Sequence, residues 1–456
     1  MAKRGPAATT RTLAVGAAVV LACATLYLLA GSWTPAHHPN GAGGGADAEV
    51  AVFFERDDWD DFRGAALAVA RAGRAREVAE AEGAIVLEAP RSRRRVRFTW
   101  HRARGQVEAR EEAKRLAGQP HPPLAVVGSS NTALTVALAE GLRDSGAATA
   151  PALLVPLASA VRVEAPDARP VDLLAIHRGR TFRFCVDNHR LAERLVRCLA
   201  DREPDGVPKR ARLVVDRHDP YSRDLAHWLR VALEVLDPRP TVETEEYRGD
   251  SVGPEGEGPN HEEARLARSL WRAVGTGGGQ DETACVFLPL QKEPMLRLLE
   301  ALRTEGLAPY IISAGATPLR VVGGDGISLE LLRREASGPK LPFPVWVASP
   351  ASGAMPGVTA PGAEDRLQVP AEVVAAVVHA LDGAEAPADL APRLSRLDLA
   401  ADDPAAMGRP LAFGPAGERR DPPGRVLEVQ PGLDDASIFS LTPGPRGGWA
   451  EEAIGR

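Results

Sequence analysis

The chain has 456 residues, a length that favours two or three domains over one continuous core. Hydrophobic residues make up 44% and charged residues 25% of the sequence, which is close to the average of soluble globular proteins and excludes a chain disordered throughout. The 55 lysines and arginines against 61 acidic residues give a net charge of −6, so no broad basic surface for nucleic acid is expected.

The N-terminus carries a membrane-targeting pattern. Residues 12–33 contain no charged side chain, and about 20 apolar residues span the hydrocarbon core as a helix. Basic residues on the N-terminal side place residues 1–11 in the cytoplasm by the positive-inside rule. We predict an uncleaved transmembrane signal anchor at 12–33; a cleaved signal peptide and a lipoprotein signal around Cys23 are the alternatives.

Residues 34–47 are a Gly-rich linker by composition. All three alternatives place the chain after this linker outside the cytoplasm. If residues 12–33 are an uncleaved anchor, we expect a single-pass protein of the cytoplasmic (inner) membrane with its main domain in the periplasm.

Strand and helix patterns alternate behind the linker. Apolar runs typical of strands occur at residues 50–54, 96–101, 125–127 and 153–157, and helical spacing occurs at 62–81, 106–116 and 132–142. Because parallel strands need crossover helices, this order predicts a parallel sheet covered on both faces.

The middle of the chain repeats the pattern. Strands are predicted at 182–185, 212–216, 241–247, 284–288, 310–313 and 343–347, with helices between them. Asp219 is predicted to cap one of these helices, with Pro220 at its first position. Helices at 370–381 and about 390–397 follow, and then a hairpin of strands 411–413 and 425–429.

Motifs that carry chemistry are scarce. The sequence contains no GxxxxGK[ST] loop, no HExxH and no GxSxG. We therefore predict no catalytic residue, no cofactor-binding residue and no metal ligand, and expect a protein that is not an enzyme. The acidic run Asp57–Asp61 fits a solvated turn better than a cation site. Cys185, Cys198 and Cys285 stand singly, and we predict buried thiols.

One segment carries a positive signal for binding. Gly128–Thr132 lies where a parallel strand is predicted to end and a helix to begin. Exposed N–H groups at such a position attract anions, and ligands of open α/β sheets gather there. Serines at this position also serve as plain helix caps, and both interpretations remain open.

The order of several segments resembles that of the type I periplasmic binding proteins, which include the branched-chain amino acid binding proteins. Leu124–Ser130 (LAVVGSS) is similar to the family's third strand and the turn that follows it. The other similar segments are 62–69, 154–160, 182–187, 212–224 and 408–420, so the match runs in order over about residues 48–432. The resemblance implies an α/β fold of two Rossmann-like lobes with parallel sheets, joined by a three-crossover hinge and preceded by an N-terminal transmembrane or signal helix.

The resemblance also implies a division of the chain. Lobe 1 is expected to comprise residues 48–175 and about 348–403. Lobe 2 is expected to comprise 176–347 and about 404–432, including a closing hairpin. Residues 433–456 are expected to form a flexible tail.

The resemblance further implies a ligand site between the lobes. In this family a serine after the third strand and a hydroxyl after the fourth hold an amino acid's carboxylate, while an aspartate and a tyrosine of lobe 2 contact its amino group. The matching residues here are Ser129 or Ser130, Ser159, Asp187 and Tyr221.

The sequence departs from the family pattern at five places: Ala160, Asp187, Ser222, residues 100–103 and the acidic residue of lobe 2. Asp187 falls one residue early, so Asn188 is an alternative to it. The acidic residue of lobe 2 has Glu293 as its nearest counterpart. These departures leave the expected fold unchanged and put amino acid binding in doubt.

Two functions are therefore expected. The first is a membrane-anchored solute-binding protein for a small polar, amino acid-like ligand, with an ABC permease or a membrane signalling protein as its partner. The alternative is an envelope scaffold or interaction module that keeps the fold but binds no small molecule.

The membrane topology leads to a direct test. If residues 12–33 are an uncleaved anchor, protease added outside sealed spheroplasts should release a folded fragment by cutting in the linker near residues 41–45. Protection of residues 48–456 under these conditions would contradict the extracytoplasmic placement.

Overall fold

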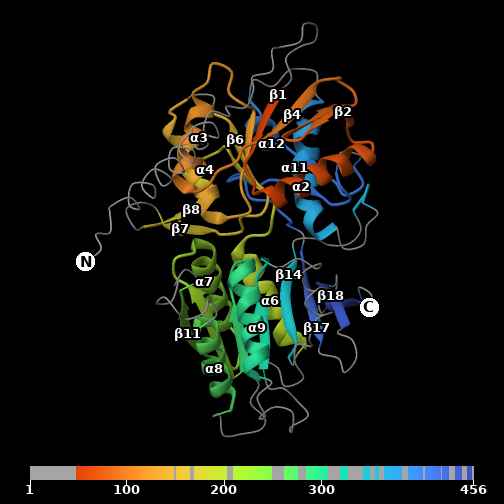
Figure 1. Cartoon of the computed structure of the whole chain (residues 1–456). Coiled ribbons are helices and arrows are strands. Elements are labelled where there is room, and N and C mark those ends of the chain that lie inside the picture. Colours follow the sequence, from red (N-terminus) through yellow and green to blue (C-terminus); the bar gives the residue numbers. More distant parts are fainter. Residues whose placement is uncertain are drawn as a thin grey trace, which may run out of the picture. The chain divides into compact units, whose positions relative to one another are not determined.

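The computed structural model is organised by two open α/β sheets (Figure 1). Residues Asp47–Arg456 form one unit. The structure describes residues 48–147, 150–164, 169–202, 209–248, 261–275, 284–306, 319–326, 343–349, 355–358, 364–382, 389–403, 406–422, 424–430, 437–443 and 449–453. No helix within these ranges is long and apolar enough to span a membrane, and the predicted anchor at 12–33 lies outside them.

The first sheet has seven strands in the order β2-β3-β4-β1-β5-β6-β9. Its strands are β1 (Ala48–Val52), β2 (Arg76–Ala81), β3 (Ala84–Glu88), β4 (Arg95–Trp100), β5 (Ala125–Val127), β6 (Ala152–Val155) and β9 (Thr181–Arg183). β1 lies between β4 and β5, with Val50 opposite Phe98 on one side and Ala125 on the other. Strands β4, β1, β5 and β6 are parallel, as predicted, and β9 adds a further parallel strand beside β6.

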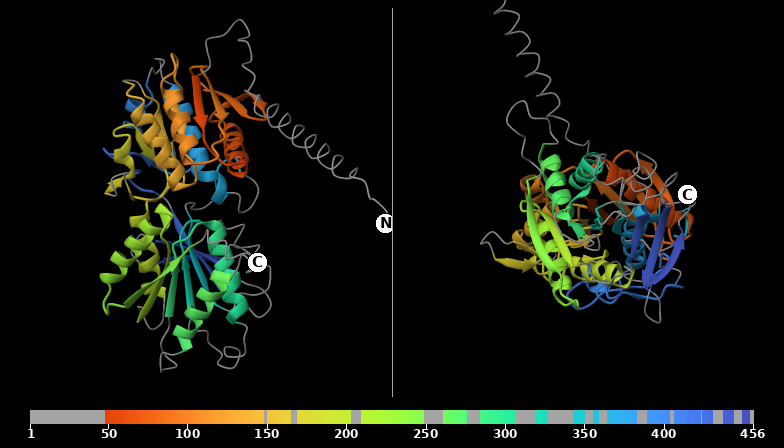
Figure 2. Two further views of the ribbon diagram at one scale, coloured as in Figure 1. Left: turned by 60° about the vertical axis from the view of Figure 1, so that its left-hand side comes forward. Right: turned by 90° about the horizontal axis from the view of Figure 1, so that it is seen from below.

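Helices cover both faces of this sheet (Figure 2). Because side chains alternate along a strand, Val50 and Val52 pack under α2 (Arg56–Arg71) and α11 (Glu364–Leu381). Ala51 and Phe53 pack on the other face, under α3 (Gln106–Ala117) and α4 (Thr132–Asp144). We call this sheet and its helices lobe 1.

The predicted helix at 62–81 is wrong in its second half. Helix α2 ends at Arg71 because Gly73 adopts a left-handed conformation with φ 73°. The following β2 pairs antiparallel with β3, and β3 with β4, so the outer edge of the sheet is not parallel. All six residues of β2 are exposed, which explains why no apolar alternation marked it as a strand.

The second sheet has eight strands in the order β11-β10-β12-β13-β14-β17-β18-β19. Its strands are β10 (Arg210–Asp216), β11 (Thr241–Tyr247), β12 (Ala284–Leu288), β13 (Leu319–Gly323), β14 (Val345–Ser349), β17 (Arg425–Gln430), β18 (Ser437–Pro443) and β19 (Trp449–Ala453). Helices α8 (His261–Gly275) and α9 (Lys292–Gly306) cover one face, and α6 (Asn188–Arg202) and α7 (Pro220–Glu234) cover the other. We call this sheet and its helices lobe 2.

The C-terminal part departs most from the predictions. The predicted hairpin of 411–413 and 425–429 does not form, because β16 (Leu411–Ala412) pairs with β15 (Asp398–Leu399) and β17 pairs with β14. The tail predicted to be flexible contains β18 and β19, which extend the second sheet. The predicted strand at 310–313 lies outside the described residues.

The chain crosses between the two sheets three times. It leaves lobe 1 after β9, returns after β14 and leaves again after β16. β9 lies in the range expected for lobe 2, yet it pairs with β6 in the first sheet. Helix α11 begins before the predicted residue 370, so Pro370 lies inside it. The short helix predicted near 390–397 is α12 (Ala391–Leu394).

Buried charges fasten the crossovers to lobe 1. The Glu372 carboxylate of α11 pairs with Arg409 at 2.8 Å and Arg419 at 2.5 Å, and all three residues are buried. Arg419 also donates to the Phe184 carbonyl at 3.2 Å, so the first and third crossovers share one group. Burial lowers the pKa of Arg409 to about 10. One carboxylate thus compensates two guanidiniums.

This arrangement predicts a large effect of a small change. Glu372→Gln keeps the shape of the side chain but removes the charge that pairs with two buried guanidiniums, which should lower the free energy of unfolding by about 3–5 kcal/mol. Urea unfolding followed by circular dichroism measures it. Glu300→Gln, in a pair where the Glu300 side chain is 52% exposed, should cost at most about 1 kcal/mol. Equal losses in the two variants would contradict the role of Glu372.

Candidate functional site

The carboxyl ends of the parallel strands of lobe 1 share one edge of the sheet. Ser129 and Ser130 follow β5, Ser159 follows β6, and Asp187 follows β9. The first turn of α2, with Asp58, follows β1 at the same edge. All predicted site residues of this lobe therefore lie where ligands of such sheets bind.

The two serines after β5 have different surroundings. Ser129 is buried, and its Oγ accepts a hydrogen bond from the Asn131 amide at 3.0 Å. Ser130 is half-buried, and its Oγ donates to the Asp58 carboxylate. Asn131 is the N-cap of α4, since its Oδ1 accepts from the amides of residues 133 and 134. Neither serine caps the helix.

Two hydroxyl side chains, one from each lobe, meet at Asp325, which follows β13. The Tyr221 hydroxyl donates to Asp325 Oδ1 at 2.8 Å. Ser159 Oγ donates to the same oxygen at 3.5 Å, at the outer limit of a hydrogen bond. Gly324 lets them approach, because a Cβ there would lie 2.0 Å from the Tyr221 hydroxyl oxygen. The structure thus brings together two predicted residues, Ser159 and Tyr221.

Sequence reasoning missed Asp325. Strand β13, after which it lies, is not among the strands that the sequence predicts. An aspartate directly after an apolar run, within a glycine-rich turn, was the available signal. Glu293, the acidic residue named instead, has a side chain 70% exposed and pairs with Lys292 at 3.9 Å.

The surroundings of Asp325 shift its pKa and that of Tyr221. Burial raises the pKa of the Asp325 carboxyl, while the hydrogen bonds from Tyr221 and Ser159 oppose this rise. Burial and the nearby carboxylate raise the pKa of Tyr221 well above its ordinary value. Within the part of the chain that the structure describes, Asp325 has hydroxyl partners but no ion pair.

Asp187 and Asn188 take other positions. Asp187 Oδ1 accepts from the Arg190 amide at 2.9 Å and so caps α6. Asn188 is buried and donates from Nδ2 to Asp224 at 2.9 Å. Asp224 also accepts from the amides of Val161 at 2.8 Å and Arg162 at 2.9 Å. The buried Asp224 carboxylate thus joins α7 to the segment after β6.

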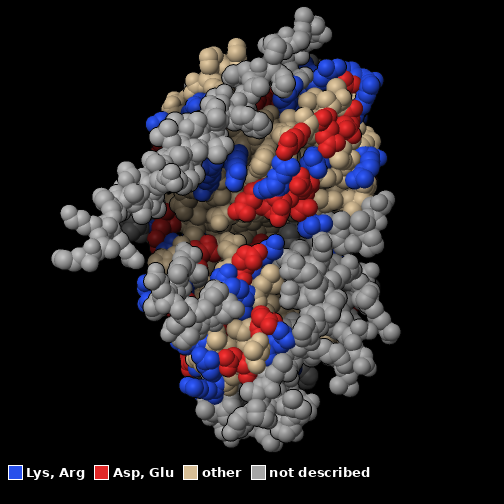
Figure 3. All heavy atoms as spheres, viewed as in Figure 1, with Lys and Arg blue, Asp and Glu red and all other residues tan. Residues whose placement is uncertain are grey.

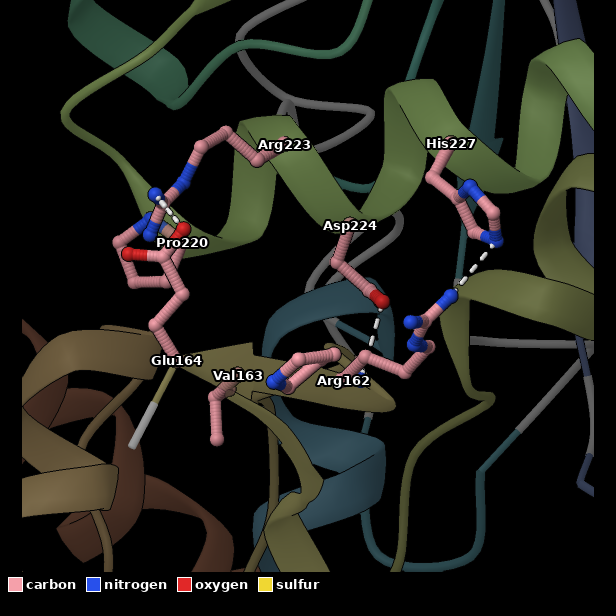
Figure 4. Close-up of a pocket in the computed structure, with 8 residues that line it drawn as sticks. Arg162, Val163, Glu164, Pro220, Arg223, Asp224 and His227 are labelled. Carbon is pink, nitrogen blue, oxygen red and sulfur yellow. Dashed lines mark hydrogen bonds and ion pairs between the residues drawn. The ribbon is translucent and has the colours of Figure 1, made fainter. Parts of the chain in front are cut away.

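A pocket of about 200 Å³ lies beside this junction (Figure 4). It is lined by α7 and by the hairpin of β7 (Arg162–Glu164) and β8 (Pro170–Asp172). Arg162 Nη1 lies 3.0 Å from His227 Nε2, and Arg223 pairs with Glu164. Burial and Arg162 lower the pKa of His227, which favours the neutral imidazole that can accept this bond. These contacts hold the hairpin against α7.

Two predicted local features are confirmed near the site. Asp219 caps α7, with its Oδ1 accepting from the Tyr221 amide at 3.1 Å, and Pro220 begins the helix. Cys185, Cys198 and Cys285 are buried free thiols.

The acidic run at 57–61 forms the first turns of α2 rather than a loop, and Asp60 pairs there with Arg56 and Arg63. No set of potential metal ligands comes together among the residues described.

Comparison with known proteins supports the implied fold. No family model and no curated protein matches the sequence. A substrate-binding protein of an ABC transporter from Desulfitobacterium hafniense, in complex with Leu, aligns with a TM-score of 0.56 at 13% identity over 86% of this chain and 100% of its own. A leucine binding protein from Thermotoga maritima gives 0.55 at 14% identity over 86% and 97%.

A third similar structure binds a different ligand. The solute binding protein of an ABC transporter from Rhodopseudomonas palustris, in complex with p-hydroxybenzoic acid, gives a TM-score of 0.56 at 12% identity over 86% of this chain and 95% of its own. Together with the two sheets and three crossovers, these alignments confirm the two-lobe fold of the type I periplasmic binding proteins.

The Asp219 carboxyl predicts a specific pH dependence. Burial, with a contribution from Asp216, raises its pKa to about 6, against about 3.9 in an unfolded chain. The folded state therefore binds the proton more tightly, and this group lowers stability as the pH rises from about 4 to about 6. Asp219→Asn keeps a capping oxygen without the charge.

We expect the stability of Asp219→Asn relative to the wild type to increase between pH 4 and pH 6 and then to level off. Urea unfolding at a series of pH values measures the difference. A difference independent of pH would show that Asp219 titrates normally in the folded protein.

Proposed function

We propose that the chain is an extracytoplasmic solute-binding protein that clamps a small polar metabolite between its two lobes. The observation that carries the proposal is the cluster of Ser159, Tyr221 and Asp325, to which both lobes contribute. These residues lie at carboxyl ends of strands or at the start of the helix that follows one, where proteins with open sheets bind ligands. Domain closure around such a cluster is the usual mode of binding in two-lobe proteins.

The polar groups suit a ligand with a protonated amino group. Asp325 offers a partly exposed carboxylate held by two hydroxyls. An ammonium group is the complement of such a carboxylate, because charge-assisted hydrogen bonds are the stronger kind. An amino acid-like metabolite is therefore the first candidate class.

The delivery route forms part of the proposal. The uncharged segment at 12–33 would anchor the protein in the cytoplasmic membrane, with the two lobes outside. The three similar proteins are substrate- or ligand-binding proteins, and two of them are components of ABC transporters. We propose an ABC permease as the partner, with a membrane signalling protein as the alternative partner.

A scaffold without a ligand is the second candidate function. One observation favours it, namely that the polar groups at the junction already satisfy one another. Ser130 is bound to Asp58, and Tyr221 is bound to Asp325. A closed network of this kind can also hold two lobes together permanently.

A ligand screen separates the two functions. The full chain in mild detergent is heated with amino acids, amides, sugars, amines and aromatic acids, and unfolding is followed by fluorescence. A ligand at 100 times its Kd should add about 2.7 kcal/mol to the free energy of unfolding. An unchanged unfolding temperature across all classes would favour the scaffold.

Tyr221→Phe tests the position of the site. Removing the hydroxyl that orients Asp325 should weaken ligand binding by about 10- to 100-fold, the effect of a hydrogen bond to a charged group. Isothermal titration measures the affinity. Tyr247→Phe is the matched control, because the Tyr247 hydroxyl donates to the Glu263 carboxylate at 2.7 Å within the same lobe. Equal affinities in Tyr221→Phe and the wild type would place the ligand elsewhere.

A further inference from the structure

We infer that the solute is a cation, an amine or a guanidinium compound, and that its recognition requires no carboxylate group. This inference rests on the proposed function and specifies the ligand class of the same site. It departs from the resemblance, which implies that Ser129 or Ser130 holds the carboxylate of an amino acid.

The first step concerns Ser130. Its hydroxyl proton is donated to the Asp58 carboxylate, so the donor expected to meet a ligand carboxylate already has an anionic partner from the same chain. A ligand carboxylate at Ser130 would also lie beside Asp58, and like charges at such a distance disfavour each other. Ser129 is buried, and its Oγ is engaged by the Asn131 amide at 3.0 Å.

The second step concerns Asp325. Its carboxylate is partly exposed, and its side-chain partners are the hydroxyls of Tyr221 and Ser159. Ser159 and Ser130 follow β6 and β5, which are adjacent parallel strands and therefore lie about 4.8 Å apart. Asp58 therefore lies at this edge of lobe 1, and Asp325 of lobe 2 contacts the same edge through Ser159.

The third step concerns the basic side chains at this edge. Arg56 pairs with Asp60 at 3.8 Å and lies over the Trp100 ring at 5.3 Å. Arg183 is 3% exposed and donates to the Ala160 carbonyl. Among the described residues, neither Asp58 nor Asp325 forms an ion pair.

The carboxylates of Asp58 and Asp325, which have no ion-pair partner within the described ranges, give this region a negative potential. Figure 3 shows acidic side chains, with basic ones among them, over the start of α2. Asp60 pairs there with Arg56 and Arg63, and Asp61 pairs with Arg366. Asp57 and Asp58 lie in the same turn. A negative potential attracts cations and repels anions. A cationic ligand would supply the counter-charge that these two carboxylates lack among the described residues.

The experiment uses matched ligands. The full chain in mild detergent is titrated calorimetrically with L-ornithine and putrescine, L-arginine and agmatine, and L-leucine and isopentylamine. Each pair shares one amine skeleton with and without the carboxylate. The anions 4-methylpentanoate and benzoate complete the set. We expect at least one amine to bind as tightly as its amino acid or tighter, and neither anion to bind.

Each other outcome is decisive. If an amino acid binds and its amine does not, or if an anion binds, the solute-binding function stands and the inference of a cationic ligand is overturned. If none of the eight compounds binds, the inference of a cationic ligand is overturned, and the broader ligand screen decides the proposed function.

Two variants locate the recognised charge. Asp325→Asn keeps an acceptor for the Tyr221 hydroxyl, and Asp58→Asn keeps one for Ser130. For the amine that binds, we expect about a 10- to 100-fold loss of affinity in each variant, as for lost charge-assisted hydrogen bonds. Glu246→Gln, an exposed residue of β11, is the control with the same charge change. Unchanged affinity in both aspartate variants, with unfolding temperatures close to the wild type, would overturn the inference.

Discussion

Glu372 is the group on which the connection between the two lobes depends. Its carboxylate pairs with two buried guanidiniums, those of Arg409 and Arg419. Arg419 also bonds the carbonyls of Phe184 and Pro410, so the charge triad fixes backbone of the first and third crossovers. An uncompensated buried charge is costly, and the crossovers therefore have little freedom to shift relative to α11. The edge of lobe 1 at which the site residues lie is set by these crossovers.

The junction of the lobes follows a second rule, that buried polar groups need partners. Asp224 accepts two backbone amides from the segment after β6 and the Asn188 amide. The hairpin of β7 and β8 adds the contacts of Arg162 and Arg223 with α7. These bonds join the two lobes. A hinge motion that separates the lobes at this point would therefore have to break all of them together. Asn188 links this network to the Tyr221 carbonyl, so a ligand bound at Asp325 would act on the contacts between the lobes through Ser159 and Tyr221.

The balance of charge distinguishes this site from the one that the resemblance implies. Aspartates stand beside hydroxyl groups at Ser130 and at Tyr221, where an anionic ligand group would need free donors. The fold alone does not impose this arrangement. It results from two side chains, Asp58 and Asp325, that come from opposite lobes and from segments far apart in the sequence.

The sequence by itself determined the alternation of strands and helices, the Asp219 cap, the buried thiols and the position of Ser130 and Ser159 after parallel strands. These features depend on periodicity and on neighbours within a few residues. The tertiary structure decided the antiparallel edge at β2, the strands after residue 432, the partner of Ser130 and the role of Asp325. Edge strands lack a buried face to mark them, and the Asp58–Ser130 and Tyr221–Asp325 contacts join residues whose approach depends on the folded sheets and crossovers.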